Sequence, residues 1–219
     1  MNVPMPDEYA TGGSLVSGTL TGYHFGSNIT KIKSYAFSYC KYLTELTIPN
    51  GVEVMETRAI SACNNLETIY VPDSVTDIQN NAFTSCVHLT SVRLPSALTL
   101  IKTGLLQQCT SLETINIPNT VTEFYDYAFD MCNSLTTINM PSSLTKINGR
   151  VFSGCVALLE LSFVGFQNIP TLGNSNSFQN TNANLKIVVP DDLYAQWITE
   201  TNWVSVASKI VKESDYAGA

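Results

Sequence analysis

Six cysteines carry the most reactive side chains of this 219-residue chain, and they follow one another at a strict interval of 23 residues. They are Cys40, Cys63, Cys86, Cys109, Cys132 and Cys155. Structural zinc sites usually contain pairs of cysteines with two residues between them, and no such pair occurs here. Disulfides between successive repeats would require the parallel side chains to turn toward each other. We therefore expect a file of buried, reduced thiols with raised pKa values, which pack as small hydrophobic groups and donate weak S–H hydrogen bonds.

No other set of side chains has the spacing of a catalytic or metal site. The two histidines, His24 and His88, lie on different repeats without a second histidine or a carboxylate at ligand spacing. Glu45 and Glu160 occupy the same position of their repeats but are five repeats apart, too far for the paired carboxylates of a glycosidase. The nucleophile elbow, the phosphate-binding loop and the dinucleotide fingerprint are all missing. We expect no catalytic residue, no metal, no cofactor and no enzymatic activity.

Composition limits the partners. The formal net charge is −7 and only 13% of the residues are charged, whereas 44% are hydrophobic. An acidic chain is poorly suited to neutralise phosphates, so a nucleic acid partner is not expected. No apolar run reaches the ~20 residues that span a bilayer, and residues 1–13 have neither a basic start nor an apolar stretch. We expect neither direct membrane insertion nor a secretion signal in this chain.

The cysteines belong to a 23-residue repeat, which reads V-T-x-I-x-x-x-A-F-x-x-C-x-x-L-x-x-I-x-I-P. The segment L-x-x-I-x-I alternates like a strand, and the proline after it cannot donate a ladder hydrogen bond, so the strand ends there. V-T-x-I predicts a second short strand, and x-A-F-x-x-C one helical or 3₁₀ turn. Stacked coils would place equal residues above one another at the inter-strand spacing, so that the apolar positions form continuous columns.

The two ends of the array depart from the repeat. We expect a flexible leader at residues 1–12, a solenoid at 13–190 and a helical cap with a tail at 191–219. The solenoid would consist of an N-terminal strand that includes Leu20, six regular coils, and one degenerate coil with an insertion around residues 172–177. In the cap, Asp191 or Asp192 would start a short helix that carries Trp197, and Asn202 would start a second helix. The two tryptophans, Trp197 and Trp203, would close the last coil.

The repeat resembles the BspA-type leucine-rich repeat of bacterial and protist surface proteins. The residues that carry the resemblance are, for example, Val121–Phe124, Ala128–Cys132, Leu135 and Ile138–Pro141, and the tail from Val189 through Trp197 to Trp203 is similar to the family's closing segment. The resemblance implies a leucine-rich-repeat solenoid of the α/β class, built mainly from short parallel β-strands with 3₁₀ or helical turns and a short C-terminal helical cap. It also implies an extracellular or cell-surface location and adhesion without chemistry.

The candidate binding residues are those that point outward from the longer strand. One outward position differs from coil to coil, as Thr47, Tyr70, Arg93, Asn116 and Asn139. Tyrosine and arginine are enriched in interface hot spots, so Tyr70 and Arg93 are the strongest candidates; a threonine-rich strand face is also simply good strand composition. A second outward set precedes the phenylalanine column: Tyr35, Arg58, Tyr127 and Arg150.

Two functions follow from these observations. The first is a non-catalytic, adhesin-like binding module, monomeric in isolation, that presents the solenoid to a protein or glycan of a host or neighbouring cell. The alternative is a structural spacer or receptor-binding component of a surface fibre or virion. Ordered self-assembly would favour the spacer, and a stable monomer would favour the binding module.

Overall fold

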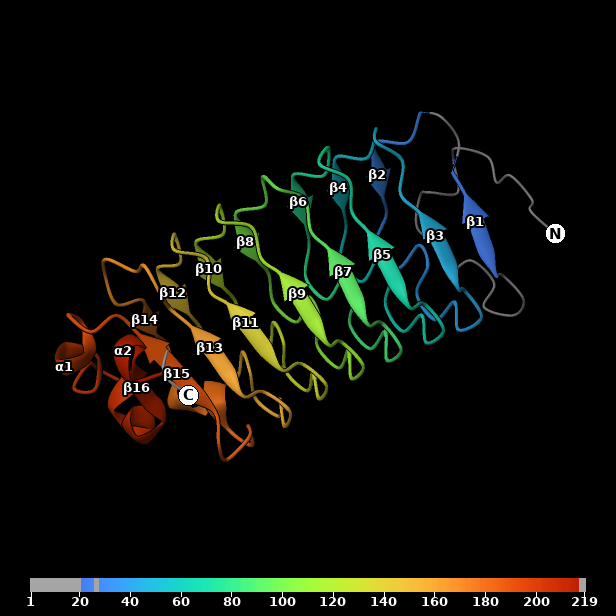
Figure 1. Ribbon diagram of the computed structural model, residues 1–219. Coiled ribbons are helices and arrows are strands. Elements are labelled where there is room, and N and C mark those ends of the chain that lie inside the picture. Colours follow the sequence, from blue (N-terminus) through green and yellow to red (C-terminus); the bar gives the residue numbers. More distant parts are fainter. Residues whose placement is uncertain (1–20, 26–27, 217–219) are drawn as a thin grey trace.

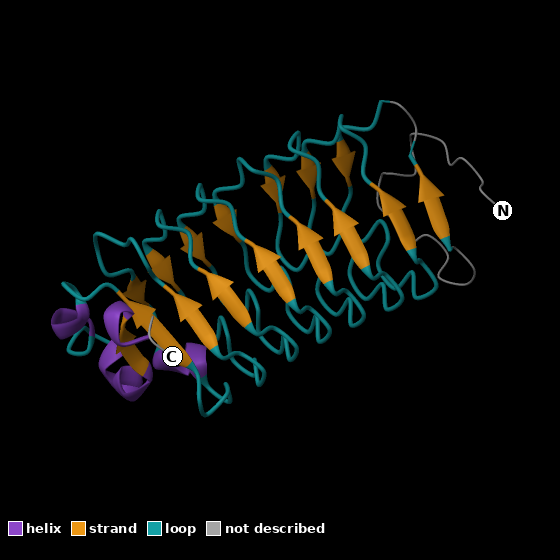
Figure 2. Cartoon of the chain, in the orientation of Figure 1, coloured by secondary structure: helices purple, strands orange, loops and turns teal. Residues whose placement is uncertain are grey.

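The chain winds into a solenoid of about eight turns, and each of the first seven turns contributes one short strand to each of two opposite faces (Figures 1 and 2). The computed structural model describes residues 21–25 and 28–216. The expected leader at residues 1–12 and Leu20 lie outside the described residues. Every pairing between described strands is parallel, with the registers set by the 23-residue repeat from β1 to β13.

One face, which we call the long-strand face, consists of strands three or four residues long. They are β1 (Gly22–His24), β3 (Glu45–Thr47), β5 (Thr68–Tyr70), β7 (Ser91–Arg93), β9 (Thr114–Asn116), β11 (Thr137–Asn139), β13 (Glu160–Ser162), β15 (Lys186–Val189) and β16 (Ile210–Lys212). The expected fold class is confirmed by these parallel strands and by their regular spacing. Between β3 and β13 the central residue of each strand is buried and its neighbours point outward, which is the alternation expected of a strand with one buried face.

The opposite face consists of two-residue strands. They are β2 (Lys31–Ile32), β4 (Val54–Met55), β6 (Asp77–Ile78), β8 (Leu100–Ile101), β10 (Glu123–Phe124), β12 (Lys146–Ile147) and β14 (Thr171–Leu172). A proline follows the longer strands β3, β5, β7, β9, β11 and β15, as the sequence predicts. For example, the carbonyl of Pro72 accepts a hydrogen bond from the N–H of Val75, and this turn carries the chain toward the opposite face.

The core between the two faces is continuous along the solenoid. Every apolar column of the repeat is buried, and the file of aromatic rings formed by Phe124, Phe129, Phe152 and Phe178 extends it toward the C-terminal end. The aromatic and aliphatic side chains stack on their equivalents in the next coil, so each coil buries the exposed face of its neighbour. A single coil has no comparable interior, which is why the fold needs several of them.

The segment before each cysteine has a different conformation from the expected helical or 3₁₀ turn. In the first regular coil the N–H groups of residues 35, 37 and 39 donate to carbonyls of the next coil, while those of residues 36, 38 and 40 close turns within their own coil. Two residues per coil adopt a left-handed conformation, at Tyr35 and Tyr39 and at the equivalent positions of the later coils. Alternate N–H groups are thus diverted to the neighbouring coil, and a 3₁₀ ladder cannot form.

The last coil and the cap differ from the expectations in two respects, the place of the insertion and the form of the second helix. Equivalent residues are 25 positions apart between β12 and β14, and 26 apart between β13 and β15, so most of the insertion precedes β14 and does not follow residue 172. The last coil contains the short helix η2 (Ser175–Phe178), and the cap contains α1 (Tyr194–Trp197), η3 (Trp203–Lys209) and α2 (Glu213–Tyr216). The second expected helix is a 3₁₀ helix that ends at Lys209, because Ile210–Lys212 pairs as β16 with the open edge of β15.

The expected helix caps also form different contacts. Neither Asp191 nor Asp192 caps α1, whose N-cap residue is Leu193; the Asp191 carboxylate instead accepts a hydrogen bond of 3.0 Å from the N–H of Ser214 in α2. Asn202 precedes η3 but donates its amide N–H to the carbonyl of Leu172 at 2.6 Å. Asp191 therefore links two segments of the cap, and Asn202 links the cap to the last coil.

Candidate functional site

The structure brings three of the five predicted binding residues side by side on the long-strand face. Tyr70, Arg93 and Asn116 are in register on β5, β7 and β9. Thr47 and Asn139 occupy the same position of the flanking strands β3 and β11, and all but the half-buried Arg93 are exposed. The repeat positions this row because the central residue of each strand is buried, which turns its neighbours to solvent.

Within the row, Tyr70 and Arg93 form a fixed cluster with an aspartate that sequence analysis missed. The Arg93 guanidinium lies 4.6 Å from the centre of the Tyr70 ring. It donates one hydrogen bond of 2.9 Å to the carbonyl of Val71 and another of 2.6 Å to a carboxylate oxygen of Asp73. The other oxygen of Asp73 accepts a hydrogen bond of 2.7 Å from the N–H of Ser96. The only sequence signal for Asp73 is its position directly after the proline that ends β5.

The ionisation states of this cluster are fixed by its own hydrogen bonds. The hydrogen bond from Arg93, followed by those from Ser96, lowers the pKa of Asp73 to about 2, and the carboxylate raises the pKa of Arg93 in turn. The ion pair therefore persists over the physiological pH range. The charges of Arg93 and Asp73 are already paired with each other. The part of the cluster that is available to a ligand is therefore mainly the Tyr70 ring, since this residue is 57% exposed.

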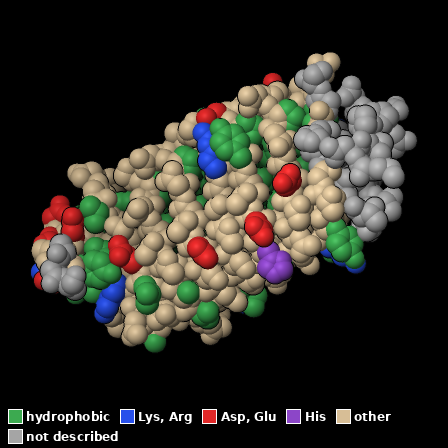
Figure 3. All heavy atoms as spheres, turned by 45° about the vertical axis from the view of Figure 1, so that its right-hand side comes forward, with side chains coloured by type: hydrophobic (Ala, Val, Ile, Leu, Met, Phe, Trp, Pro, Cys, Tyr) green, Lys and Arg blue, Asp and Glu red, His purple; other side chains and the backbone are tan. Residues whose placement is uncertain are grey.

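A shallow hollow lies beside Tyr70 over β3 and β5. It has a volume of about 350 Å³, and its lining includes Thr47 and Tyr70 together with Glu45 and Thr68. Charged side chains are sparse on the surface seen in Figure 3, where uncharged side chains and backbone predominate. The row thus combines an aromatic surface and an adjoining hollow with hydroxyl and amide groups.

The open part of the long-strand face ends near β13. Helix α2 packs against β15 and β16 (Figure 1), and the hydroxyl of Tyr216 donates a hydrogen bond of 3.0 Å to the Glu160 carboxylate on β13. Val188 of β15, which pairs with Ser162, is buried. A ligand on this face would therefore contact β3 to β11, where the predicted row lies.

The cysteines lie in the core and none is in a disulfide. Five of them donate the S–H group to the carbonyl of the aromatic-column residue 26 positions earlier; for example, Cys86 donates to Ile60 at 3.0 Å and Cys155 to Phe129 at 3.1 Å. Burial raises the pKa of Cys40 to about 11 and that of Cys155 to about 12. The thiols of Cys40 and Cys155 are therefore protonated and weakly nucleophilic at neutral pH.

The predicted structural tryptophans close the C-terminal end of the core. Trp197 and Trp203 are fully buried, 5.4 Å apart between ring centres, and both pack edge-on against Phe163. The indole N–H of Trp203 donates a hydrogen bond of 2.8 Å to the carbonyl of Pro170. The Trp197 N–H has no hydrogen-bond partner among the described residues.

The groups with potential for chemistry remain apart. His88 is exposed and its Nδ1 lies 2.5 Å from the backbone carbonyl of Asn64; the side chain of His24 lies outside the described residues. Over residues 21–25 and 28–216, no three metal-ligating side chains come together. No helix in the same part of the chain has the length and apolar character to cross a membrane.

The second outward set lies along the edge of the solenoid formed by residues 33–42 and their equivalents in later coils, which we call the turn edge. Tyr35, Arg58, Tyr127 and Arg150 all have positive φ there, and the Arg150 guanidinium lies 5.6 Å from the centre of the Tyr127 ring. Sequence analysis missed two further exposed tyrosines of this edge, Tyr39 and Tyr42. The only feature of the sequence that could have indicated these two tyrosines is that the equivalent turn positions of the other coils hold smaller or polar residues.

Comparison with known proteins gives one family and several solved structures. The family model described as the BspA type leucine-rich repeat region matches residues 16–136 and 76–195 in six copies. A leucine-rich repeat protein from Eubacterium ventriosum is 23% identical over 74% of this chain, with a TM-score of 0.66, and this chain spans 43% of its length. The leucine-rich repeat protein of T. pallidum is 23% identical, with a TM-score of 0.63, over 87% of this chain and 85% of its own. No curated protein gives a significant sequence match.

Proposed function

Because the chain belongs to the BspA-type leucine-rich repeat family, we propose that it is a non-catalytic binding module whose long-strand face holds a protein ligand. Of the two expected ligand classes, protein and glycan, we choose a protein on a host or neighbouring cell, and we place the module at the cell surface or in the extracellular space. Proteins of this family are typically surface proteins that mediate binding. The burial of all six cysteines fits a role in packing.

The cluster of Tyr70, Arg93 and Asp73 is the observation that carries this proposal. Its hydrogen bonds hold the Arg93 guanidinium in place before any ligand arrives, and the guanidinium packs over the exposed ring of Tyr70. A preorganised side chain loses little entropy when it binds, so its contact area contributes more to affinity. Tyrosine and arginine are also the residue types that dominate protein interfaces, and the surrounding threonines and asparagines suit a polar rim.

The architecture favours a protein over a smaller ligand at this face. The row extends over five successive strands, β3 to β11, and its hollow is shallow. Small ligands are usually bound in concave pockets that bury most of their surface, whereas protein partners are held by broad surfaces with a few anchoring residues. The long-strand face is a broad surface with a few anchoring residues, as in protein interfaces.

The experiment compares variants that use residues already present in the same column. Tyr70→Thr copies Thr47 and Arg93→Asn copies Asn116, so both should fold normally. We expect either substitution to weaken binding to the cognate protein about tenfold or more while the thermal midpoint changes little. Binding would be measured by biolayer interferometry against a panel of purified matrix proteins and glycans.

The matched control is Arg150→Asn on the turn edge, which should leave this affinity unchanged. Unaltered affinity in both Tyr70→Thr and Arg93→Asn would reject the long-strand face as the binding surface.

A further inference from the structure

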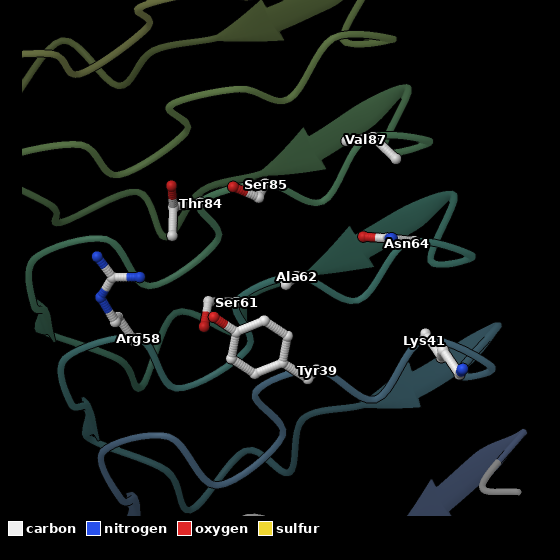
Figure 4. A pocket seen from close by; sticks show the side chains of 9 residues that line it. All are labelled: Tyr39, Lys41, Arg58, Ser61, Ala62, Asn64, Thr84, Ser85 and Val87. Carbon is white, nitrogen blue, oxygen red and sulfur yellow. The ribbon is translucent and has the colours of Figure 1, made fainter. Parts of the chain in front are cut away.

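The turn edge carries a groove over the first three regular coils (Figure 4), which we call the turn groove. Its volume is about 420 Å³, and its lining includes Tyr39, Lys41, Arg58, Asn64 and Ser85. The groove exists because one turn position changes size from coil to coil: it is occupied by Tyr39, then by Ala62, then by Ser85, all with positive φ. The large tyrosine is followed by two small side chains, so the surface falls away beside its ring.

The charge of the turn groove opposes that of the whole chain. None of its nine lining residues, all of them described, is acidic, whereas two are basic, in a protein of net charge −7. The Arg58 side chain has no hydrogen bond or ion pair with any described residue, unlike Arg93, Lys102 and Lys146, which are paired with carboxylates. The nearby Glu56 is held by the N–H and hydroxyl of Ser34. Arg58 therefore keeps all its donors for a ligand.

The other groups of the groove are aromatic, hydroxyl and amide groups. The ring of Tyr39 is 63% exposed, the largest exposed fraction among the described large hydrophobic residues. On one side of the groove lie Arg58 and Thr84, and on the other Lys41, Asn64 and Val87 stand on successive coils (Figure 4). The Asn64 amide satisfies its hydrogen bonds when its nitrogen faces the carbonyls of Ser85 and Ala62, so this side chain supports the wall of the groove.

We propose that the turn groove binds a carboxylated saccharide, with the carboxylate on Arg58 and the sugar ring against Tyr39. A guanidinium binds a carboxylate through two parallel hydrogen bonds, which gives this contact both strength and direction. An aromatic ring offers an apolar face to the C–H side of a sugar, and hydroxyl and amide groups match the sugar hydroxyls. The groove lacks the apolar depth that would anchor the side chains of a peptide, and its volume suits one or two sugar units.

The test uses 3′-sialyllactose and a hyaluronan tetrasaccharide as probes, with lactose as the neutral control. Binding is measured by calorimetry and by saturation-transfer NMR on the full chain. We expect the carboxylated probes to bind with a Kd on the order of 1 mM or tighter, more weakly as the salt concentration rises, and lactose to show no detectable binding. Absence of binding by both carboxylated probes, or equal binding of lactose, would overturn the proposal.

The variants are again taken from the chain itself. Arg58→Asn copies Asn81, which has the same positive φ in the next coil, and Tyr39→Ala copies Ala62. We expect each to weaken binding of the carboxylated probes about tenfold or more. Arg150→Asn, at the equivalent turn position four coils further on, and Tyr70→Thr, on the long-strand face, should bind the probes like the parent chain.

Two further outcomes separate this proposal from other possibilities. If a hexapeptide of glutamate binds as tightly as the sugars and is equally sensitive to Arg58→Asn, the groove takes acidic protein segments and the saccharide proposal is wrong. If Arg58→Asn and Tyr39→Ala retain the parent affinity, the sugars bind elsewhere and the proposal is also wrong. Neither result would bear on protein binding at the long-strand face, because this inference does not depend on that function.

Discussion

At the level of single residues, the cysteines act as hydrogen-bond donors between coils. In five coils the S–H group reaches the carbonyl of an aromatic-column residue in the preceding coil, at distances of 3.0–3.2 Å. Cysteine suits this position because it is small and apolar and still donates a weak hydrogen bond. The environment that buries the thiol also favours its neutral form.

This preference makes stability sensitive to alkaline pH. The ordinary pKa of 9.0 is raised to about 11 in Cys40 and to about 12 in Cys155. A raised folded-state pKa contributes stability that is complete below pH 9 and is lost as the pH rises toward 11–12, because the unfolded chain releases its protons first. We expect the free energy of unfolding, measured with urea, to fall above pH 9, and Cys155→Ala to reduce that slope by about 1.4 kcal/mol per pH unit. An unchanged slope would contradict the raised pKa.

The two tryptophans allow a second comparison between single residues. Both are fully buried in the same aromatic cluster, but only the Trp203 indole N–H has a hydrogen-bond partner, the carbonyl of Pro170. Trp203→Phe leaves that carbonyl without its donor, whereas Trp197→Phe removes an unsatisfied N–H. We therefore expect Trp203→Phe to be more destabilising than Trp197→Phe by about 1–3 kcal/mol, measured by urea denaturation. Equal losses would mean that ring volume alone matters at both positions.

At the level of secondary structure, the turn edge contains many side chains in a conformation that favours glycine. Each regular coil has two left-handed residues, and most are not glycine, among them Ala62 with φ of 55°. For an L-residue the left-handed conformation costs roughly 1–2 kcal/mol. The intercoil hydrogen bonds of this edge impose the conformation regardless of residue type.

A pair of identical substitutions three positions apart tests this cost. Ala62→Gly removes the steric penalty and should be neutral or stabilising by up to about 1 kcal/mol, whereas Ala59→Gly should be destabilising by about 1 kcal/mol. Ala59 is fully buried and is not among the left-handed residues, so glycine there only loses contacts and adds freedom to the unfolded chain. Thermal unfolding of both variants gives the comparison. If Ala62→Gly is as destabilising as Ala59→Gly, the left-handed residues are not strained.

The strands and buried columns could be predicted from the sequence, because alternation and the proline column depend on local pattern. The turn conformation was not predicted, because only Gly104 and Gly154 indicate positive φ in columns that other coils fill with residues such as Tyr35 or Met131. Strand β16 could not be predicted from the local pattern either, because the spacing of its apolar residues is helical. The strand forms because these residues pair with the edge of β15. At the binding face, residue type indicated Tyr70 and Arg93, whereas the contact with Asp73 and the turn groove arise only when coils stack.

At the level of the whole molecule, the solenoid is a stack whose ends must be closed. At the C-terminal end, β16 pairs with β15, and Trp197 and Trp203 cover Phe163. An uncovered strand edge next to an apolar surface is a template for association with another chain. The protein is expected to stay monomeric only if this end is closed. A monomer would in turn favour the binding module over the fibre spacer. Ordered filaments formed by the full chain in analytical ultracentrifugation and microscopy would favour the spacer.

Truncation of the cap tests the closure directly. A chain that ends at Pro190 loses β16 and both tryptophans, so the edge of β15 and the ring of Phe163 become exposed. We expect this variant to self-associate and to unfold at a lower temperature, as measured by sedimentation velocity and calorimetry. The matched control ends at Lys212: it lacks α2 but keeps β16 and both tryptophans, and it should stay monomeric with a small loss in thermal midpoint. If the chain that ends at Pro190 remained monomeric and equally stable, the last coil would be self-sufficient and the cap would serve some purpose other than closure.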